Sequence, residues 1–201
     1  PLLNSRMQTP EAPTEYEIRS GRIEAELRRE SRLPETRLIV MANSGDHDIG
    51  NRWFGSTAVK VARQADCPVL LVPANFSFSG FRRITVATDQ SKVSAWHKNF
   101  VDGMISPENG KVDYVNIELK KPLNASVLTT EEIPDNSVIQ HWADTVEEGL
   151  LSYASETDSD LIVLLAQHRR GWQDLFHRSC TRELARKCPL PILVVPPAPK
   201  S

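Results

Sequence analysis

Cysteine and long apolar runs are both scarce in this sequence. The three cysteines are Cys67, Cys180 and Cys188, and no pair has the C-x-x-C spacing of a zinc ribbon or a thioredoxin-like site. Three reduced thiols are therefore expected, in a cytoplasmic protein. The longest apolar runs, such as residues 161–166, are as long as a strand and shorter than the roughly 18 residues of a membrane helix. The polar, proline-broken start does not resemble a secretory leader.

Several motifs that carry chemistry are also missing. The sequence has no phosphate-binding G-x-x-x-x-G-K-[S/T] loop, no dinucleotide-binding G-x-G-x-x-G and no G-x-S-x-G around a nucleophilic serine. The 24 basic and 26 acidic residues leave a formal net charge of −2, so nothing draws the chain towards nucleic acid or an anionic membrane. Asp46, His47 and Asp48 are interpreted as a solvated loop, because neighbouring residues rarely converge on one ion, and no metal is predicted.

An internal repeat organises the chain. The run Leu-Ile-Val at residues 38–40 recurs at residues 161–163, an offset of 123. Without any gap, the same offset superimposes further identical residues in the two halves: Ser56 on Ser179, Ala62 on Ala185, Arg63 on Arg186, Pro68 on Pro191, Leu70 on Leu193, Val72 on Val195 and Pro73 on Pro196. The chain therefore contains two copies of one supersecondary unit.

Each copy ends with the same succession of elements. An apolar run, residues 37–42 or 160–166, predicts a buried strand. A polar loop and an amphipathic helix follow, and a proline then ends the helix and opens a second apolar strand. A strand, a helix and a strand in close succession predict parallel strands joined by a crossover helix.

The second copy can be followed from its beginning. Strands are expected at residues 81–89, 112–119 and 137–142, before the two strands already described. Helices are expected at residues 91–104 and 145–155, with Asp144 as the cap of the latter. The result is an α/β unit, doubly wound around a parallel sheet of five strands.

The offset also defines what the first copy contains. Counterparts of the first two strands would lie before residue 1, so this copy is expected to start after its second strand. It retains a third strand at residues 16–19, a helix at residues 22–31 and the two final strands. The predicted domains are residues 1–75, the C-terminal part of the first unit, and residues 81–201, the complete second unit.

One segment of the first copy resembles the universal stress protein family. Nucleotide-binding members carry Gly, two residues, Gly, nine residues, Gly and then Ser or Thr, followed by a helix and a Cys-Pro-apolar strand. The matching residues are Ala42, Gly45, Gly55 and Ser56, and then the Cys-Pro-Val-Leu-Leu-Val of residues 67–72. The resemblance implies two Rossmann-like units of adenine-nucleotide-hydrolase type, related by a pseudo-two-fold axis. It also implies ATP as the ligand of the first domain.

The chemistry of this motif is simple. Glycine lets the backbone approach phosphate oxygens closely, and Ser56 and Thr57 begin a helix, whose free N–H groups favour an anion. Ala42 replaces the first glycine. Two interpretations remain open: an adenine-nucleotide site formed by Ala42, Gly45, Gly55, Ser56 and Thr57, or a tight turn with a helix cap and no ligand.

The second copy departs further from the motif. Its positions carry Leu165, His168 and Arg178, and only Ser179 is retained. Such bulky side chains should fill a phosphate cradle, so this copy is expected to be structural. Asp89 matches an acidic residue that nucleotide-binding relatives use, but it is interpreted as a strand-end residue. The basic residues 168–170 and 177–178 are interpreted as a solvated face.

The final strand of each copy suggests how the two copies meet. Residues 69–73 and 192–196 are short, apolar edge strands, which would expose unpaired backbone groups. In the family, such strands pair antiparallel across a two-fold axis. Self-association through these edges is therefore expected, within the chain or in a homodimer, with the strands near Leu71 and Val194 in contact.

Three classes of function follow. The first is a tandem universal stress protein, a stress-response module with at most weak ATP hydrolysis. The second is a protein-interaction module that binds no nucleotide, which Ala42 and the bulky residues of the second copy favour. The third, an enzyme such as an adenylating ligase, has the least support because no phosphate-loop or nucleophile motif is present.

Overall fold

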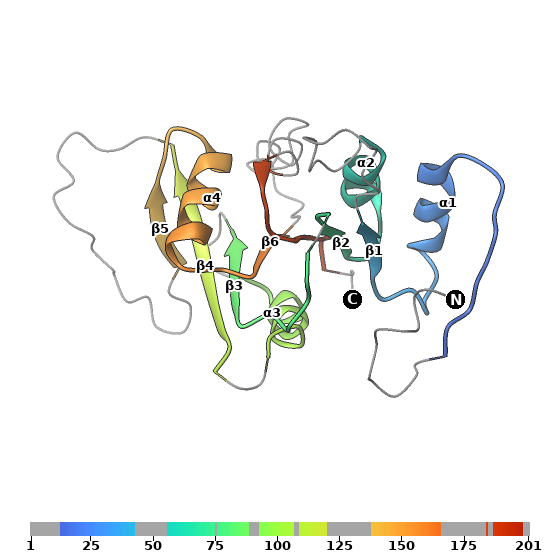
Figure 1. Ribbon diagram of the computed structural model, residues 1–201, viewed down its shortest axis with the longest axis horizontal. Helices are drawn as coiled ribbons and strands as arrows, with labels where there is room; N and C mark the ends of the chain where they lie inside the picture. The colour runs from blue at the N-terminus through green and yellow to red at the C-terminus, as the bar shows by residue number, and fades with distance from the viewer. Residues whose placement is uncertain are drawn as a thin grey trace, which may run out of the picture.

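A computed structural model gives the structure of the chain and describes residues 13–42, 56–74, 76–88, 93–106, 109–119, 138–165, 184 and 187–198. Within these residues, seven strands form one sheet with the order β1-β2-β7-β6-β3-β4-β5 (Figure 1). The elements are β1 (Ile39–Ala42), β2 (Val69–Val72), β3 (Arg83–Ala87), β4 (Lys111–Glu118), β5 (Val138–Trp142), β6 (Leu161–Leu165), β7 (Ile192–Val195), α1 (Ile23–Glu30), α2 (Ser56–Gln64), α3 (Ala95–Asp102) and α4 (Val146–Glu156).

The second repeat contributes five strands, β3 to β7. Each of their pairings is parallel, and their spatial order is β5-β4-β3-β6-β7. The predicted five-stranded parallel sheet, with order 3-2-1-4-5, is therefore confirmed. Central β6 is buried along its whole length because β3 and β7 flank it, which explains its continuous apolar sequence.

The two repeats meet through their last strands. β2 pairs antiparallel with β7, with Leu71 opposite Ile192 and Val69 opposite Val194. The expected contact between these strands is confirmed within one chain. The equivalent pairs β1–β2 and β6–β7 thus run in opposite directions across the junction, as a pseudo-two-fold relation requires.

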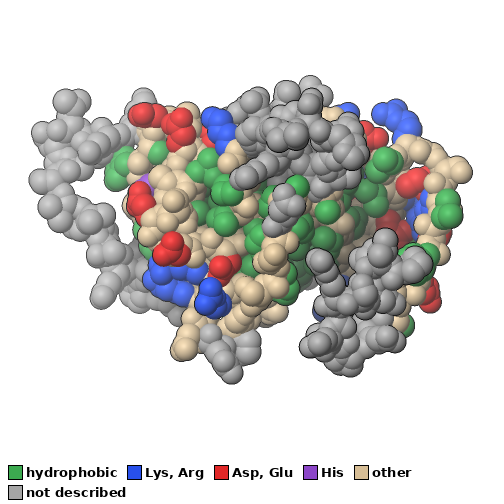
Figure 2. Space-filling view, in the orientation of Figure 1, with side chains coloured by type: hydrophobic (Ala, Val, Ile, Leu, Met, Phe, Trp, Pro, Cys, Tyr) green, Lys and Arg blue, Asp and Glu red, His purple; other side chains and the backbone are tan. Residues whose placement is uncertain are grey.

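Helices cover both faces of the sheet. On one face, α1, α2 and α4 lie over an apolar cluster that includes Val59, Leu71, Leu150 and Ile192. On the other face, α3 lies over a second cluster around Val163. In Figure 2, charged side chains of both signs lie around the periphery of the visible face, and hydrophobic side chains gather over its centre.

The expected strand at residues 16–19 is wrong. These residues belong to no helix or strand, and Tyr16 and Ile18 are 76% and 98% exposed. The repeat offset aligns this segment with β5, which is a strand because it pairs with β4. No described strand lies beside residues 16–19, so their backbone groups lack the ladder that defines a strand. Instead, Arg19 forms ion pairs with Glu17 and Glu30.

The expected cap of α4 is also wrong. Thr145, rather than Asp144, has the extended backbone of an N-cap residue, and its hydroxyl accepts a hydrogen bond from the Glu148 N–H at 3.2 Å. Asp, Ser and Thr are all good caps. The residue is selected by the point at which the backbone enters the helix, and the sequence pattern left that point uncertain by one residue.

Candidate functional site

The glycine motif of the first repeat runs from the carboxyl end of β1 to the amino end of α2. Ala42 is the last residue of β1 and is exposed, whereas Ser56 and Thr57 are the first two residues of α2. Gly45 and Gly55 lie outside the described residues. The structure therefore fixes both ends of the motif on defined elements.

Packing holds α2 in place. Val59 and Ala62 are buried in the apolar cluster under this helix, and the Lys60 ammonium lies 3.5 Å from the Glu24 carboxylate of α1. The Ile39 N–H donates to the Pro68 carbonyl at 2.9 Å, which anchors β1 beside the segment that follows α2. Because α2 is a crossover helix between parallel strands, its amino end lies at the same end of the sheet as the carboxyl end of β1.

The electrostatics at the amino end of α2 suit an anion. The first four N–H groups of an α-helix have no acceptor within the helix, and the helix dipole places partial positive charge there. The first turn of α2 contains no acidic side chain that would neutralise this charge. A phosphate group in front of Ser56 and Thr57 would thus meet a favourable potential.

The corresponding position in the second repeat is filled. Leu165 ends β6, is fully buried, and belongs to the same apolar cluster as Val93 and Val195. A buried leucine therefore stands where the first repeat has the exposed Ala42. His168, Arg178, Ser179 and Asp89 lie outside the described residues. That the second repeat binds no nucleotide stays a prediction, and the burial of Leu165 favours it.

The two repeats also differ in what borders this end of the sheet. In a doubly wound sheet, ligands bind where neighbouring strands send their connections in opposite directions. In the second repeat this point lies between β3 and β6, which pair in parallel. In the first repeat, β1 is the terminal strand of the sheet and has only β2 as a described neighbour. The repeat pattern had placed no strand beside β1. The glycine motif alone did not show the consequence, which is that only one of the two strands that would border its site, β1, is described.

A buried ionic cluster lies at the opposite end of the strands. The Asp113 carboxylate is 4% exposed, 2.8 Å from Arg83 Nη2 and 3.2 Å from Lys111 Nζ. Burial, and secondly the Asp113 charge, raise the pKa of Tyr153 to about 12. These groups lie near the amino ends of β3 and β4, and the strands β2, β7 and β6 separate them from the glycine motif at β1. Their charges neutralise one another, and we therefore assign them a structural role. The alternating pattern of this segment had not indicated Asp113 as buried; Arg83, its partner on the neighbouring strand, was the available signal.

The described cysteines do not suit nucleophilic chemistry. Cys67 and Cys188 are both buried and free. Burial raises the pKa of the Cys67 thiol, and it raises the pKa of Cys188 to about 11. Both thiols are therefore protonated near neutral pH and poor nucleophiles. In the described part of the chain, no three potential ligands converge on a metal site, and no helix is long and apolar enough to cross a membrane.

Comparisons with solved structures agree with this architecture. A universal stress protein from Archaeoglobus fulgidus DSM 4304 superimposes with a TM-score of 0.59 and 18% identity, covering 86% of this chain and 64% of that chain. This chain thus spans less than two thirds of the length of that relative. A functionally unknown protein from Pseudomonas aeruginosa PAO1 superimposes with a TM-score of 0.57 and 15% identity, covering 89% of this chain and 69% of that chain. At these identities the likeness concerns the fold.

Sequence comparison identifies the family. No protein among those with curated descriptions matches the sequence. Residues 4–73 and 101–196 match the universal stress protein family, and these two segments include most of both repeats. The segments also follow the internal repeat, since each ends just after the last strand of a repeat, β2 or β7. The chain therefore belongs to the universal stress protein family.

Proposed function

We propose that this chain is a stress-response module that binds an adenine nucleotide, such as ATP, in its first repeat, while its second repeat is structural. One observation carries the proposal. An exposed Ala42 and the amino end of α2, whose first turn carries no acidic side chain, lie at the same end of the sheet in the first repeat, whereas the second repeat places a buried leucine there. The cytoplasmic location expected from cysteine usage belongs to the same proposal.

Each residue of the motif has a role in this proposal. Gly45 and Gly55 would let the backbone approach the phosphates, and the N–H groups of Ser56 and Thr57 would donate to phosphate oxygens. Binding should be weak, because Ala42 adds a methyl group where the family has glycine and because β1 supplies only one described wall. No described group is placed to act as nucleophile or general base, so ATP hydrolysis is expected to be slow or undetectable.

The test is ATP binding by calorimetry with a matched pair of variants. The wild-type chain should bind with a Kd on the order of 1 mM, which corresponds to about −4 kcal/mol. Gly55→Val should abolish binding, because it places a branched side chain on the phosphate path. Arg178→Val, at the equivalent position of the second repeat, should bind as the wild type does. If the wild-type chain shows no binding at several millimolar ATP, the proposal is wrong.

The second candidate function is protein interaction without a nucleotide. The observations that favour it are the alanine at the first motif position of the first repeat, Ala42, and the bulky, buried Leu165 at the equivalent position of the second repeat. The same titration separates the two functions, since an interaction module would bind no ATP while keeping its fold.

A further inference from the structure

Lys60 is the first basic residue of α2. It follows Ser56 by four residues, so the two residues share one face of the helix and lie about 6 Å apart along its axis. Both are exposed. Side chains of a helix lean towards its amino end, and the Lys60 stem therefore extends towards Ser56. This places the ammonium group within reach of an anion that binds in front of Ser56 and Thr57.

In the structure, this ammonium group lies beside a carboxylate. Lys60 Nζ is 3.5 Å from Glu24 Oε1, in the first turn of α1. That distance exceeds the roughly 2.7–2.9 Å of a direct charge-assisted hydrogen bond, and the Lys60 side chain is 48% exposed. Ion pairs of this kind contribute little to stability. Lys60 is therefore free to exchange Glu24 for a partner of higher charge.

The second repeat replaces this lysine by an acidic residue. The offset of 123 places Glu147 at the position of Glu24 and Glu183 at the position of Lys60. Glu147 lies in the first turn of α4, as Glu24 lies in the first turn of α1. The repeat that keeps two motif glycines thus has a lysine here, and the repeat that lacks them has a glutamate. A positive charge at this position attracts a phosphate, and a negative charge repels it.

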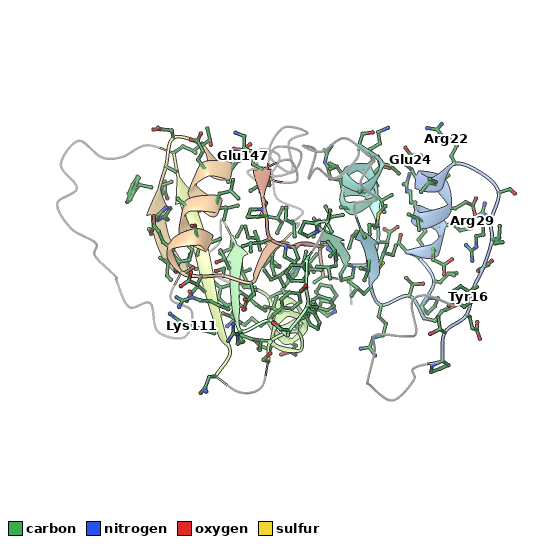
Figure 3. All side chains as sticks on the ribbon, viewed as in Figure 1. Tyr16, Arg22, Glu24, Arg29, Lys111 and Glu147 are labelled. Atoms are coloured by element: carbon green, nitrogen blue, oxygen red, sulfur yellow. The ribbon has the colours of Figure 1, made fainter. Side chains whose placement is uncertain are left out.

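The other charges beside Glu24 do not oppose an anion. Glu26, the second acidic residue in the first turn of α1, lies 3.6 Å from Arg29. Arg22 precedes α1 and is exposed. Figure 3 shows Arg22 and Glu24 at the same end of α1, with Glu24 on the side of α2. Among the described residues, Glu24 is therefore the acidic group that competes with a bound anion for Lys60.

We infer that Lys60 binds a phosphate oxygen of the nucleotide and that Glu24 competes for the same ammonium group. A terminal phosphate carries a charge of roughly −1.5 to −2 near neutral pH, more than the single charge of a carboxylate, so the ammonium group moves from Glu24 to the phosphate when the nucleotide binds. Lys60 thus selects nucleotides over the bare nucleoside, and Glu24 lowers the affinity for them. The inference rests on the proposed function, because it assigns a further residue to the same site.

The test compares the ATP affinity of single variants of the full chain by calorimetry. Lys60→Met removes the ammonium group but keeps an unbranched stem, and it should weaken ATP binding about fivefold. Glu24→Gln removes the competing carboxylate and should strengthen binding about twofold. An ion pair that only holds α1 against α2 predicts no such opposite shifts, because both variants break the same contact. The matched control is Arg63→Met, at an exposed basic residue in the last turn of α2, which should bind ATP as the wild type does.

A spectroscopic measurement locates the contact. The NMR signal of the Lys60 ε-methylene group should shift on addition of ATP and stay unchanged on addition of adenosine, which has no phosphate. If the wild type binds ATP but Lys60→Met binds it equally well, or if Arg63→Met loses as much affinity as Lys60→Met, the inference is wrong and nucleotide binding itself stands. If the wild type binds no ATP, the proposed function is wrong and the inference falls with it.

Discussion

The junction between β2 and β7 should make the two repeats unfold as one unit, and Leu71→Ala tests this. Leu71 is fully buried and lies opposite Ile192 across the junction. It belongs to the apolar cluster that extends from β1 across β2, β7 and β6 to α4. A loss of packing at this point therefore acts on side chains of both repeats.

The size of the effect follows from burial. Replacing leucine by alanine removes three carbon atoms, at about 0.8 kcal/mol each for transfer to water, and leaves a cavity that adds to the cost. The expected loss is about 2–5 kcal/mol, a large part of the 5–15 kcal/mol by which a typical domain is stable. The matched control is Val40→Ala in β1. Because Val40 is 58% exposed, this change should cost no more than about 0.5 kcal/mol.

Two assays are needed: urea unfolding measures the global stability of each variant, and hydrogen exchange measures the protection of individual amides. In Leu71→Ala, the amides of β1 and of β3 should lose the same free energy of protection, because a cooperative sheet opens as a whole. The reasoning is refuted if β1 and β2 lose protection while β3 and β6 keep that of the wild type. It is also refuted if Val40→Ala costs as much as Leu71→Ala.

Two further predictions concern single side chains. His97 is 4% exposed, its Nδ1 lies 2.7 Å from Ser94 Oγ and its Nε2 lies 3.1 Å from the Pro196 carbonyl; burial lowers its pKa below 6.5. The stability that neutral His97 contributes should be complete above about pH 6.5 and should be lost as the pH falls towards the lower pKa of the folded state. Between pH 8 and pH 5, the Tm of His97→Gln should therefore fall less than the Tm of the wild type. An equal fall in both proteins would contradict this assignment. Thr145→Ala should cost about 1 kcal/mol in urea unfolding through loss of the α4 cap, whereas Thr145→Ser should be close to wild type; an equal loss in both would exclude the cap as the cause.

Much of the fold could be predicted because, in the second repeat, the local sequence pattern of each segment agrees with the element that the segment forms. Apolar runs of strand length, separated by polar loops and ended by prolines, fixed the sequence of strands and helices. The strand order came from the family resemblance and agrees with the structure. Apart from the cap of α4, the features that the sequence did not predict have a common cause. Residues 16–19 have the composition of a strand but no described strand to pair with, and Asp113 is buried because Arg83 and Lys111 neutralise it. Both depend on contacts between distant segments, which a local pattern does not contain.

The candidate site was predictable to a smaller extent. The sequence identified Ala42, Ser56 and Thr57, and the structure places them on β1 and α2 at one end of the sheet. The difference between the repeats at Ala42 and Leu165 was visible as a change in side-chain size, and its consequence, burial, agrees with that change. The repeat offset had also placed no strand of the given residues beside β1, and the described part of the sheet agrees.

The two repeats divide between them the features that a nucleotide site needs. A nucleotide crevice in a doubly wound sheet needs two walls, which are the carboxyl ends of adjacent strands whose connections diverge. In the second repeat β3 and β6 supply both walls, but Leu165 at the end of β6 is a bulky, fully buried residue of the apolar cluster that also contains Val93 and Val195. In the first repeat the equivalent residue is the small, exposed Ala42, but β1 supplies one described wall. The repeat with the better motif and the repeat with five described strands are therefore different ones, which is why nucleotide binding by this chain should be weak.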